Sequence, residues 1–392
     1  MERLGPSACQ HRSGWSASRS PKGGRLIGVN DVAGMELTCI TVQGSPREMG
    51  EGIGEALRGR IQSLVSHRLD VARCFLEERG FKDALTVYRE AGRSCLEHLR
   101  QWDEKGHEEL AATASAADVP ILDLYSVSNL TDVRDIASRD RHIGDSDEGC
   151  TAFMVPEQSR SPLILGQTWD LNRGDMEYVV GIHRLPEDDP ETWSVTVAGT
   201  PTLIGMNEHG LWVGTTNIRV RGSHPGVGYL DIQHRALRER DFASAARVAS
   251  EAPRAAAHTY WYADPDGGMQ LECSAAKVVS RPLEHTPLVQ TNHCLDAEHV
   301  ESSVEPATPS SCERLQTATE LLADGRVDID RLKTIMSDRS QGSLSINRLP
   351  EDNEPTTTNA CMIGIPASRT FQACRGSADR GEWVTLAFDR GS

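Results

Sequence analysis

The main change in the spacing of apolar residues along this chain of 392 residues falls at about residue 150. Before that point apolar residues recur every three or four positions, which is the period of an amphipathic helix. After it they form short runs separated by Pro, Gly and Asp turns, a pattern typical of β-strands. A chain that groups helices before and between many short strands favours antiparallel sheets covered by helices.

The helical part follows a strand-like segment, residues 35–44. The sequence SPRE at 45–48 supplies an N-cap, a first-turn proline and a capping-box glutamate, so a helix is expected to begin there. Ile53, Leu57 and Ile61 then fall on one helical face. Further helices are expected near 82–101, 104–117 and 121–128.

The second part contains elements of both kinds. Strands are expected at 150–155, 163–169, 178–185, 193–199, 202–206, 211–217, 359–365, 369–374 and 383–388, with a hairpin of 259–264 and 269–273. Helices are expected at 230–239, 241–251, 311–323 and 328–338. The order predicts an α+β fold in which two stacked antiparallel sheets are covered by helices.

Two segments lack the patterns of packed structure. Residues 1–34 are rich in Ser, Arg and Gly and are expected to form a disordered tail. Residues 138–149 are polar and charged, as in an exposed loop. The expected organisation is therefore one domain, made from a mainly helical segment, 35–149, and a segment that carries the sheets, 150–392.

Composition excludes several functions. The net charge of -16 disfavours binding to bare nucleic acid or to an anionic membrane. No long apolar run or signal-peptide core occurs, and the ten cysteines are scattered without a CxxC pair, so a cytoplasmic protein with mostly buried thiols is expected. Without an HExxH or GxGxxG motif, neither a metal nor a cofactor is expected.

The junction between the loop and the first strand, Gly149-Cys150, is the strongest candidate for chemistry. Glycine leaves its carbonyl unshielded, so the following thiol can attack it and transfer the preceding chain to sulfur. Hydrolysis of the thioester formed in this way would leave Cys150 with a free α-amine. Because the unperturbed pKa of an α-amine lies near 8, one residue then supplies both a nucleophile and a base.

Asp170 lies twenty residues further on, at the end of the next expected strand. In a hairpin it would return beside Cys150, where its carboxylate would orient the α-amine. Taken alone, a cysteine in an apolar run is usually an inert core residue, and an aspartate at a strand end usually completes a turn.

The strings GCTAF and GQTWD resemble the isopenicillin N acyltransferase family, that is, the acyl-coenzyme A:6-aminopenicillanic acid acyltransferases. These are self-processing N-terminal-nucleophile cysteine hydrolases, so the resemblance implies the αββα sandwich and cleavage between Gly149 and Cys150. Three later segments are similar to the family in the same order: GMNEHGLWVGTTN, TNHC and SINR. The resemblance covers about residues 35–388.

The resemblance also implies roles for three further residues. Asn217 and Asn292 would contribute to an oxyanion hole, and Arg348 would pair with Asp170. Each residue has an ordinary structural interpretation as well: the asparagines as turn or strand-end residues, and the arginine as a surface cation. If Arg348 faces Asp170, bidentate bonding would fix the carboxylate.

The resemblance is weakest where substrate would bind. Thr168 and Asn347 differ from the penicillin-forming enzymes, and the pocket segments match poorly. An apolar or aromatic acyl group would suit the aromatic side chains expected near the pocket, although these also suit a core. They are Trp169, Tyr178, Trp212, Tyr260, Trp261 and Tyr262.

We therefore expect an amidohydrolase or acyltransferase that acts on a small N-acyl amide or peptide through a thioester on Cys150. Its partners would be a small amide or another acyl donor such as an acyl-coenzyme A, with water or an amine as acceptor, and the two processed chains are expected to stay associated. One alternative is a catalytically idle small-molecule-binding protein on the same fold. Another is an unprocessed cysteine peptidase, for which a histidine partner such as His293 would be needed. Because His293 flanks Asn292 and no papain-type signature such as CGSCW occurs, we interpret it as a structural residue.

Overall fold

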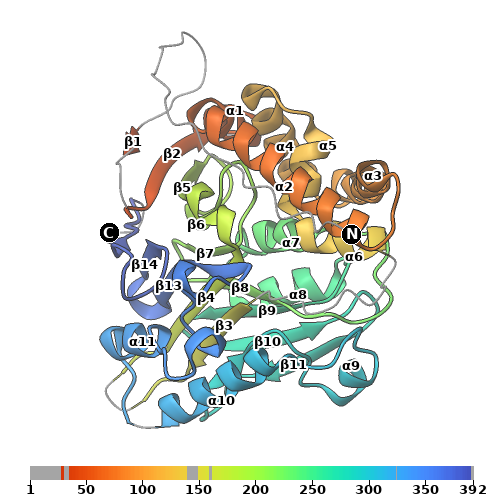
Figure 1. Ribbon diagram of the computed structural model, residues 1–392. Helices are drawn as coiled ribbons and strands as arrows, with labels where there is room; N and C mark the ends of the chain where they lie inside the picture. The colour runs from red at the N-terminus through yellow and green to blue at the C-terminus, as the bar shows by residue number, and fades with distance from the viewer. Residues whose placement is uncertain (1–27, 31–34, 139–148, 159–160, 324, 390–392) are drawn as a thin grey trace.

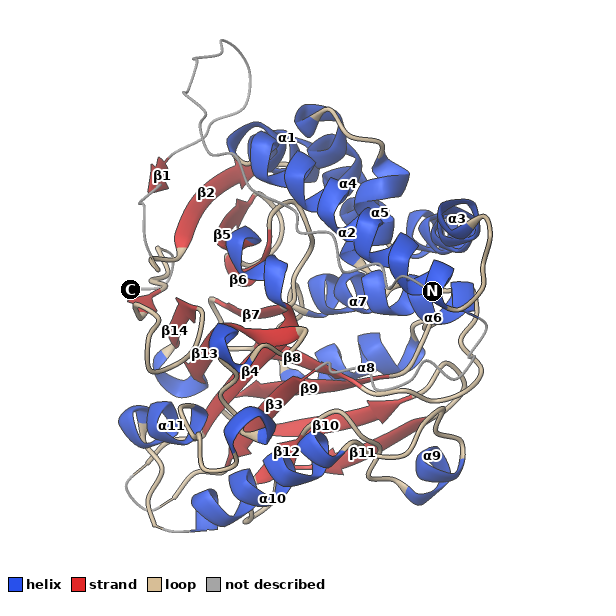
Figure 2. Cartoon of the chain, viewed as in Figure 1, coloured by secondary structure: helices blue, strands red, loops and turns tan. Residues whose placement is uncertain are grey.

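The described strands pair into two sheets, and helices cover the outer face of each sheet in the computed structural model (Figure 1, Figure 2). The structure describes residues 28–30, 35–138, 149–158, 161–323 and 325–389. In these residues the strand order is β1-β2-β5-β6-β7-β8-β9-β10-β11 in one sheet, sheet A, and β12-β3-β4-β13-β14-β15 in the other, sheet B.

The strands are β1 (Gly28–Asn30), β2 (Thr38–Gly44), β3 (Gly149–Val155), β4 (Ile164–Asn172), β5 (Val179–Pro186), β6 (Thr192–Val197), β7 (Ile204–Asn207), β8 (Trp212–Asn217), β9 (His258–Asp264), β10 (Gly267–Cys273), β11 (Val278–Pro282), β12 (Leu288–Gln290), β13 (Thr356–Ile365), β14 (Thr370–Arg375) and β15 (Val384–Thr385). The α-helices are α1 (Pro46–Ala56), α2 (Arg58–Glu78), α3 (Ala84–Trp102), α4 (Glu104–Ala117), α5 (Ile121–Ser128), α6 (Leu130–Ser138), α7 (Tyr229–Ala236), α8 (Phe242–Glu251), α9 (Ala297–Glu301), α10 (Pro309–Ala323) and α11 (Ile329–Met336).

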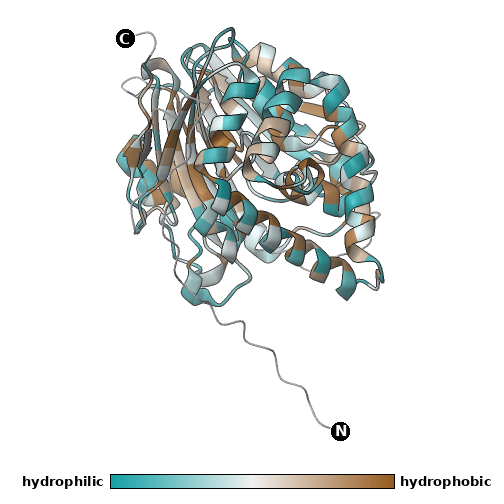
Figure 3. Cartoon of the chain, turned by 90° about the horizontal axis from the view of Figure 1, so that it is seen from above, coloured by the Kyte–Doolittle hydropathy of each residue, from teal (hydrophilic) through white to brown (hydrophobic). Residues whose placement is uncertain are grey.

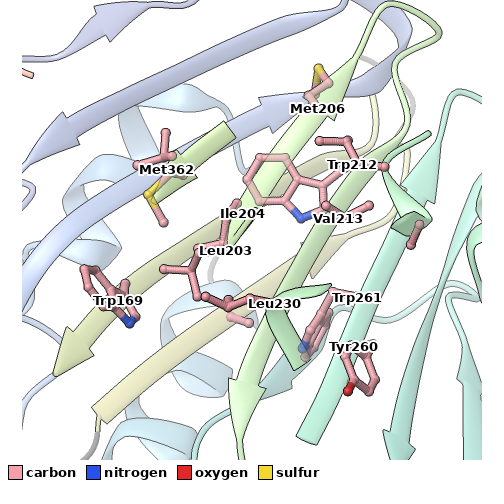
Figure 4. Close-up of a cluster of buried hydrophobic side chains, with 14 of the residues drawn as sticks. Trp169, Leu203, Ile204, Met206, Trp212, Val213, Leu230, Tyr260, Trp261 and Met362 are labelled. Carbon is pink, nitrogen blue, oxygen red and sulfur yellow. The ribbon is translucent and has the colours of Figure 1, made fainter. Parts of the chain in front are cut away.

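The core between the sheets follows from the alternation of side chains along each strand. In β3, Cys150, Ala152 and Met154 join a buried cluster that also contains residues of sheet A. Phe153 and Val155, on the opposite face, pack with α10 and α11. Figure 4 shows part of the central cluster, in which Trp169 and Met362 of sheet B lie near Ile204 and Trp212 of sheet A.

The helices of the first part cover the outer face of sheet A. Ile40 of β2 and Val180 of β5 belong to the same buried cluster as Ile53 of α1 and Ile61 of α2. Figure 3 shows these helices on one side of the strands. The result is the predicted sandwich of helices, sheet, sheet and helices.

Most expected elements occur within a few residues of their predicted bounds, with some differences. Ser45 and Glu48 form the predicted capping box, although the helix after it is divided at Leu57 into α1 and α2. The sheets are not wholly antiparallel, because β2 and β5 pair in parallel. Helix α6 and the short elements β11, β12 and α9 were not predicted.

Two predictions concern the segments that lack helix or strand patterns, residues 1–34 and 138–149. Within the predicted disordered tail, residues 28–30 form β1, which pairs with β2, so that prediction was wrong for these three residues. The rest of the tail lies outside the described residues, as does nearly all of the predicted loop at 138–149. Among the described helices, none combines the length and apolar character needed to cross a bilayer.

Candidate active site

Gly149 and Cys150 begin β3, between β4 on one side and β12 on the other. Gly149 lies opposite Asp170 in the antiparallel register, and Cys150 lies opposite Trp169. The side chain of Cys150 is buried among the residues between the sheets. The predicted hairpin therefore forms, and it brings Asp170 beside Gly149 and Cys150.

Asn292 follows β12 and contacts the backbone of Cys150. The amide nitrogen of Cys150 donates to Asn292 Oδ1 at 2.7 Å, and Asn292 Nδ2 donates to the carbonyl oxygen of Asn217 at 3.0 Å. Because Asn217 ends β8, one asparagine amide links the candidate nucleophile in sheet B to a strand end in sheet A. Three of the predicted site residues are thus joined by direct hydrogen bonds.

Asp170 and Arg348 also lie together, and both are buried. Arg348 Nε is 4.0 Å from Asp170 Oδ2, which is an ion pair without the two parallel hydrogen bonds of the expected bidentate geometry. Arg348 instead donates to Thr356 Oγ1 at 2.5 Å and to Ser310 Oγ. Burial raises the pKa of Asp170 to about 6, although the charges of Arg348 and Arg314 act in the opposite direction.

Gly149 is required here by space. A Cβ atom on this residue would lie 2.8 Å from Asp170 Oδ2 and 3.1 Å from Arg348 Cζ. The first distance is shorter than real Cβ atoms show. The carboxylate and the guanidinium therefore lie against the backbone on the Gly149 side of the candidate scissile bond. Asn292 contacts the Cys150 side of the same peptide.

Arg314 is a site residue that the sequence patterns do not indicate. It projects from α10, is fully buried, and donates to Asn292 Oδ1 at 2.9 Å, to Thr151 Oγ1 at 3.1 Å and to the carbonyl oxygen of Cys150. Burial, with the nearby charge of Arg348, lowers its pKa to about 10. In sequence it is a lone arginine in a helix that also carries polar and acidic residues, so no local signal separates it from a surface cation.

A cavity opens beside Cys150. Its lining includes Asn217, Asn292 and Asp170 together with the side chains Trp169, Leu171, Leu203, Tyr229, Thr131, Thr215 and His258. A second, more polar hollow shares Asn217 and Asn292 and continues to Arg219, His293 and Glu305. The two asparagines therefore stand at the boundary between an apolar space on the Cys150 side and a polar one.

The aromatic lining differs from the expected set. Trp169 lines the cavity, whereas Trp212, Trp261 and Tyr260 are buried in the core (Figure 4). Tyr262 is buried in the same core. Tyr178 lies outside the set that lines the cavity, and its hydroxyl bonds with Ser63. Tyr229 and His258 were missed because their positions depend on how α7 and β9 pack, which local patterns do not specify.

His293 is held by polar neighbours next to this site. Its Nδ1 lies 2.8 Å from Ser311 Oγ and 3.2 Å from Thr291 Oγ1. Burial and the charge of Arg314 lower its pKa. These contacts agree with the structural interpretation of His293.

Solved structures with a similar arrangement of elements are distant in sequence. An orthologue of N-acylethanolamine-hydrolyzing acid amidase from Caenorhabditis elegans is 15% identical over 61% of this chain and 100% of its own, with a TM-score of 0.41. Penicillin V acylase from Agrobacterium tumefaciens is 14% identical over 62% of this chain and 87% of its own, with a TM-score of 0.44. A mutant conjugated bile acid hydrolase from Clostridium perfringens is 10% identical over 62% of this chain and 97% of its own, with a TM-score of 0.39.

The comparison with curated protein sequences found no match. The comparison with family models found one match, which covers most of the sheet-forming part of the chain. The model of acyl-coenzyme A:6-aminopenicillanic acid acyl-transferase matches residues 157–380, which is more than half of the chain and includes Asp170, Asn217, Asn292 and Arg348. The chain therefore belongs to the acyl-coenzyme A:6-aminopenicillanic acid acyl-transferase family.

Proposed function

We propose that the chain cuts itself between Gly149 and Cys150 and then acts as an amidohydrolase or acyltransferase through a thioester on Cys150. The observation that carries this proposal is the environment of the Gly149–Cys150 peptide. Asp170 and Arg348 lie on its Gly149 side, and Asn292 bonds the nitrogen of Cys150. Family membership supports the reaction class, although the matched segment begins after Cys150.

The first reaction is the cleavage. Attack of the Cys150 thiol on the Gly149 carbonyl forms a tetrahedral intermediate, whose collapse breaks the C–N bond and leaves the preceding chain as a thioester on sulfur. Water then hydrolyses the thioester. The products are a carboxylate on Gly149 and a free α-amine on Cys150.

The freed α-amine is held by the contacts that the peptide nitrogen now makes. Its nitrogen lies 2.7 Å from Asn292 Oδ1 in the intact chain. When Gly149 departs, the space against Asp170 Oδ2 becomes available to the amine. An amine placed between a carbonyl oxygen and a carboxylate is well positioned to accept the proton of the Cys150 thiol.

In turnover, the thiolate attacks the substrate carbonyl and the α-amine returns its proton to the leaving amine. Asn292 Nδ2 carries two hydrogens, and one of them is used by the carbonyl oxygen of Asn217. We assign the second hydrogen as a donor to the oxyanion. Asn217 is the second residue of the proposed oxyanion hole. The acyl group then lies in the apolar cavity beside Trp169, Leu171 and Leu203.

The final step separates the two activities. Water attacking the thioester gives hydrolysis, whereas an amine gives acyl transfer, and an acyl-coenzyme A would serve as an alternative acyl donor. The polar hollow beyond Asn217 and Asn292 is the side from which we expect the leaving amine or acceptor to enter.

Mass spectrometry of the purified protein tests the cleavage. We expect two chains, one ending at Gly149 and one beginning at Cys150. Cys150→Ala should give one intact, folded chain without turnover, and Cys150→Ser a partial defect. Complete maturation of the alanine variant would disprove the assignment.

The same measurement separates the alternatives. An intact wild-type chain that iodoacetamide labels at Cys150 would favour an unprocessed cysteine peptidase. An intact chain that neither labels nor turns over amides would favour a binding protein. A screen of N-acyl amino acids, penicillins and small peptides against the matured protein would then identify the substrate.

A further inference from the structure

The imidazole of His258 forms part of the wall of the cavity that holds Cys150. His258 begins β9 and lies directly opposite Asn217 of β8. Residues directly opposite each other in an antiparallel pair project to the same face of the sheet. The ring is therefore a neighbour of the proposed oxyanion hole, and it is only 1% exposed.

Two contacts fix the orientation of this ring. Its Nε2 lies 2.5 Å from Asp132 Oδ1 of α6, and its face stacks on Tyr229 of α7 with ring centroids 4.2 Å apart. Asp132 is itself held, because its Oδ2 accepts from the backbone nitrogen of Tyr229 at 3.0 Å. A nitrogen that faces a carboxylate carries the proton, so in the neutral ring Nδ1 is a hydrogen-bond acceptor.

Nδ1 of His258 is buried without a hydrogen-bond partner among the described residues. Buried polar atoms without partners are rare in folded proteins because they lose their hydration without compensation. The stacking on Tyr229 and the contact with Asp132 use the ring face and Nε2, and neither of them uses Nδ1. Around it, Trp169, Leu171 and Leu203 make the cavity wall largely apolar. Besides the polar groups assigned to catalysis, a ligand that enters this cavity therefore meets an acceptor on His258 that has no partner among the described residues.

We propose that His258, oriented by Asp132, binds a hydroxyl or N–H group carried by the acyl part of the substrate. The inference rests on the proposed function, which places the acyl group in this cavity. It narrows the substrate class to amides of acyl groups with a hydroxyl or N–H substituent on an otherwise apolar chain or ring. His258 is then a specificity-determining residue.

The two nitrogens of His258 can be tested separately. The amide of Gln reaches about as far from the backbone as Nε2, and the amide of Asn about as far as Nδ1. His258→Gln should therefore keep the contact with Asp132 and lose the proposed ligand contact. His258→Asn should do the reverse, with lower thermal stability because α6 and β9 lose their link.

Calorimetry on the uncleaved Cys150→Ala chain measures binding independently of catalysis. The ligands are N-octanoylglycine, its isomers with one hydroxyl at successive carbons, and the analogue with a terminal carboxylate. One hydroxyl isomer should bind about tenfold to a hundredfold more tightly than N-octanoylglycine. His258→Gln should remove this preference, and His258→Asn should retain part of it.

The outcomes distinguish the subsite from the activity. Equal binding of all ligands, a preference for the carboxylate analogue, or a hydroxyl preference that survives in His258→Gln would overturn the subsite. If the wild-type chain matures and turns over N-octanoylglycine in that case, the proposed function stands. A hydroxyl preference in a chain that never matures or turns over amides would support the subsite and overturn the function. Absence of any binding would overturn the subsite.

Discussion

The side-chain amide of Asn292 has two ends with different partners, and the proposed reactions use them differently. Oδ1 accepts from the nitrogen of Cys150 and from Arg314, whereas Nδ2 donates to Asn217 and has a second hydrogen for an oxyanion. Asn292→Ala removes both ends. We expect kcat to fall roughly a hundredfold to a thousandfold, with a smaller change in KM, and self-cleavage to slow as well.

Asn292→Asp is the matched variant, because it keeps an acceptor for Cys150 and Arg314 but removes the donor. It should mature and yet show the turnover defect of the alanine variant. Steady-state kinetics and the time course of cleavage, measured by mass spectrometry, check both statements. A wild-type kcat in Asn292→Ala would show that the oxyanion is bound elsewhere.

The raised pKa of Asp170 predicts a specific pH dependence of stability. Its pKa is about 6 in the folded chain and near 3.8 when exposed, so the folded state binds this proton more tightly. Stability should therefore decrease as pH rises between these two values, by roughly 3 kcal/mol in total for a shift of about two units. Urea unfolding of the uncleaved Cys150→Ala chain at pH 4 to 7 measures this change.

Asp170→Asn in the same Cys150→Ala background should remove that component, so that the two stability curves differ in slope below pH 6 and run parallel above it. In the otherwise wild-type chain, the same substitution should slow both cleavage and turnover, because the amide cannot act as an anion beside the α-amine. Arg348→Ala should reproduce part of this defect. Identical pH slopes in the two uncleaved chains would contradict the assigned pKa.

At the scale of elements, α1 packs unusually close to α4 because glycines lie in the contact. A Cβ on Gly54 would lie 2.4 Å from the carbonyl oxygen of Thr113 and 2.7 Å from Ala116 Cβ. Gly54→Ala should destabilise the protein by about 1 to 3 kcal/mol despite the better helix propensity of alanine. Gly59→Ala in α2 is the control, because nothing lies within 4 Å of its Cβ, and it should stabilise by about 0.5 to 1 kcal/mol. Thermal unfolding of both variants tests the contrast, which would fail if the two shifts had the same sign.

Local sequence patterns predict some contacts between elements and not others. The hairpin of β3 and β4 was predictable because alternation and the intervening turn are local, and it placed Asp170 beside Cys150. Arg314 and His258 were not predictable, because each meets the site through the packing of an element distant in sequence. The parallel pairing of β2 with β5 is equally non-local, since more than 130 residues separate the two strands. Patterns thus indicate which face of an element is buried, while the partner of that face depends on the whole fold.

At the scale of the molecule, the helical segment before Gly149 is joined to the rest of the chain by buried polar pairs. Arg68 of α2 forms two hydrogen bonds of 3.1 Å with Asp175, and Glu109 of α4 accepts from Arg184 at 2.9 Å. Helices of this segment also share a buried apolar cluster with β5. None of these contacts depends on the peptide bond between Gly149 and Cys150. The cleaved chains should therefore elute together in gel filtration and separate only in denaturant.

The Arg68–Asp175 pair provides a graded test of that association. Arg68→Met leaves the carboxylate of Asp175 buried without its main countercharge, which should lower the free energy of unfolding by about 3 to 5 kcal/mol and separate the cleaved chains at lower urea. Arg68→Met combined with Asp175→Leu removes both charges and should recover most of the loss. Arg73→Ala, which breaks exposed contacts within α2, should change stability by less than about 1 kcal/mol. If the cleaved chains separate without denaturant, the contacts across the cut are too weak to hold the site together, because Asp170 and Cys150 would then lose the helices that cover sheet A.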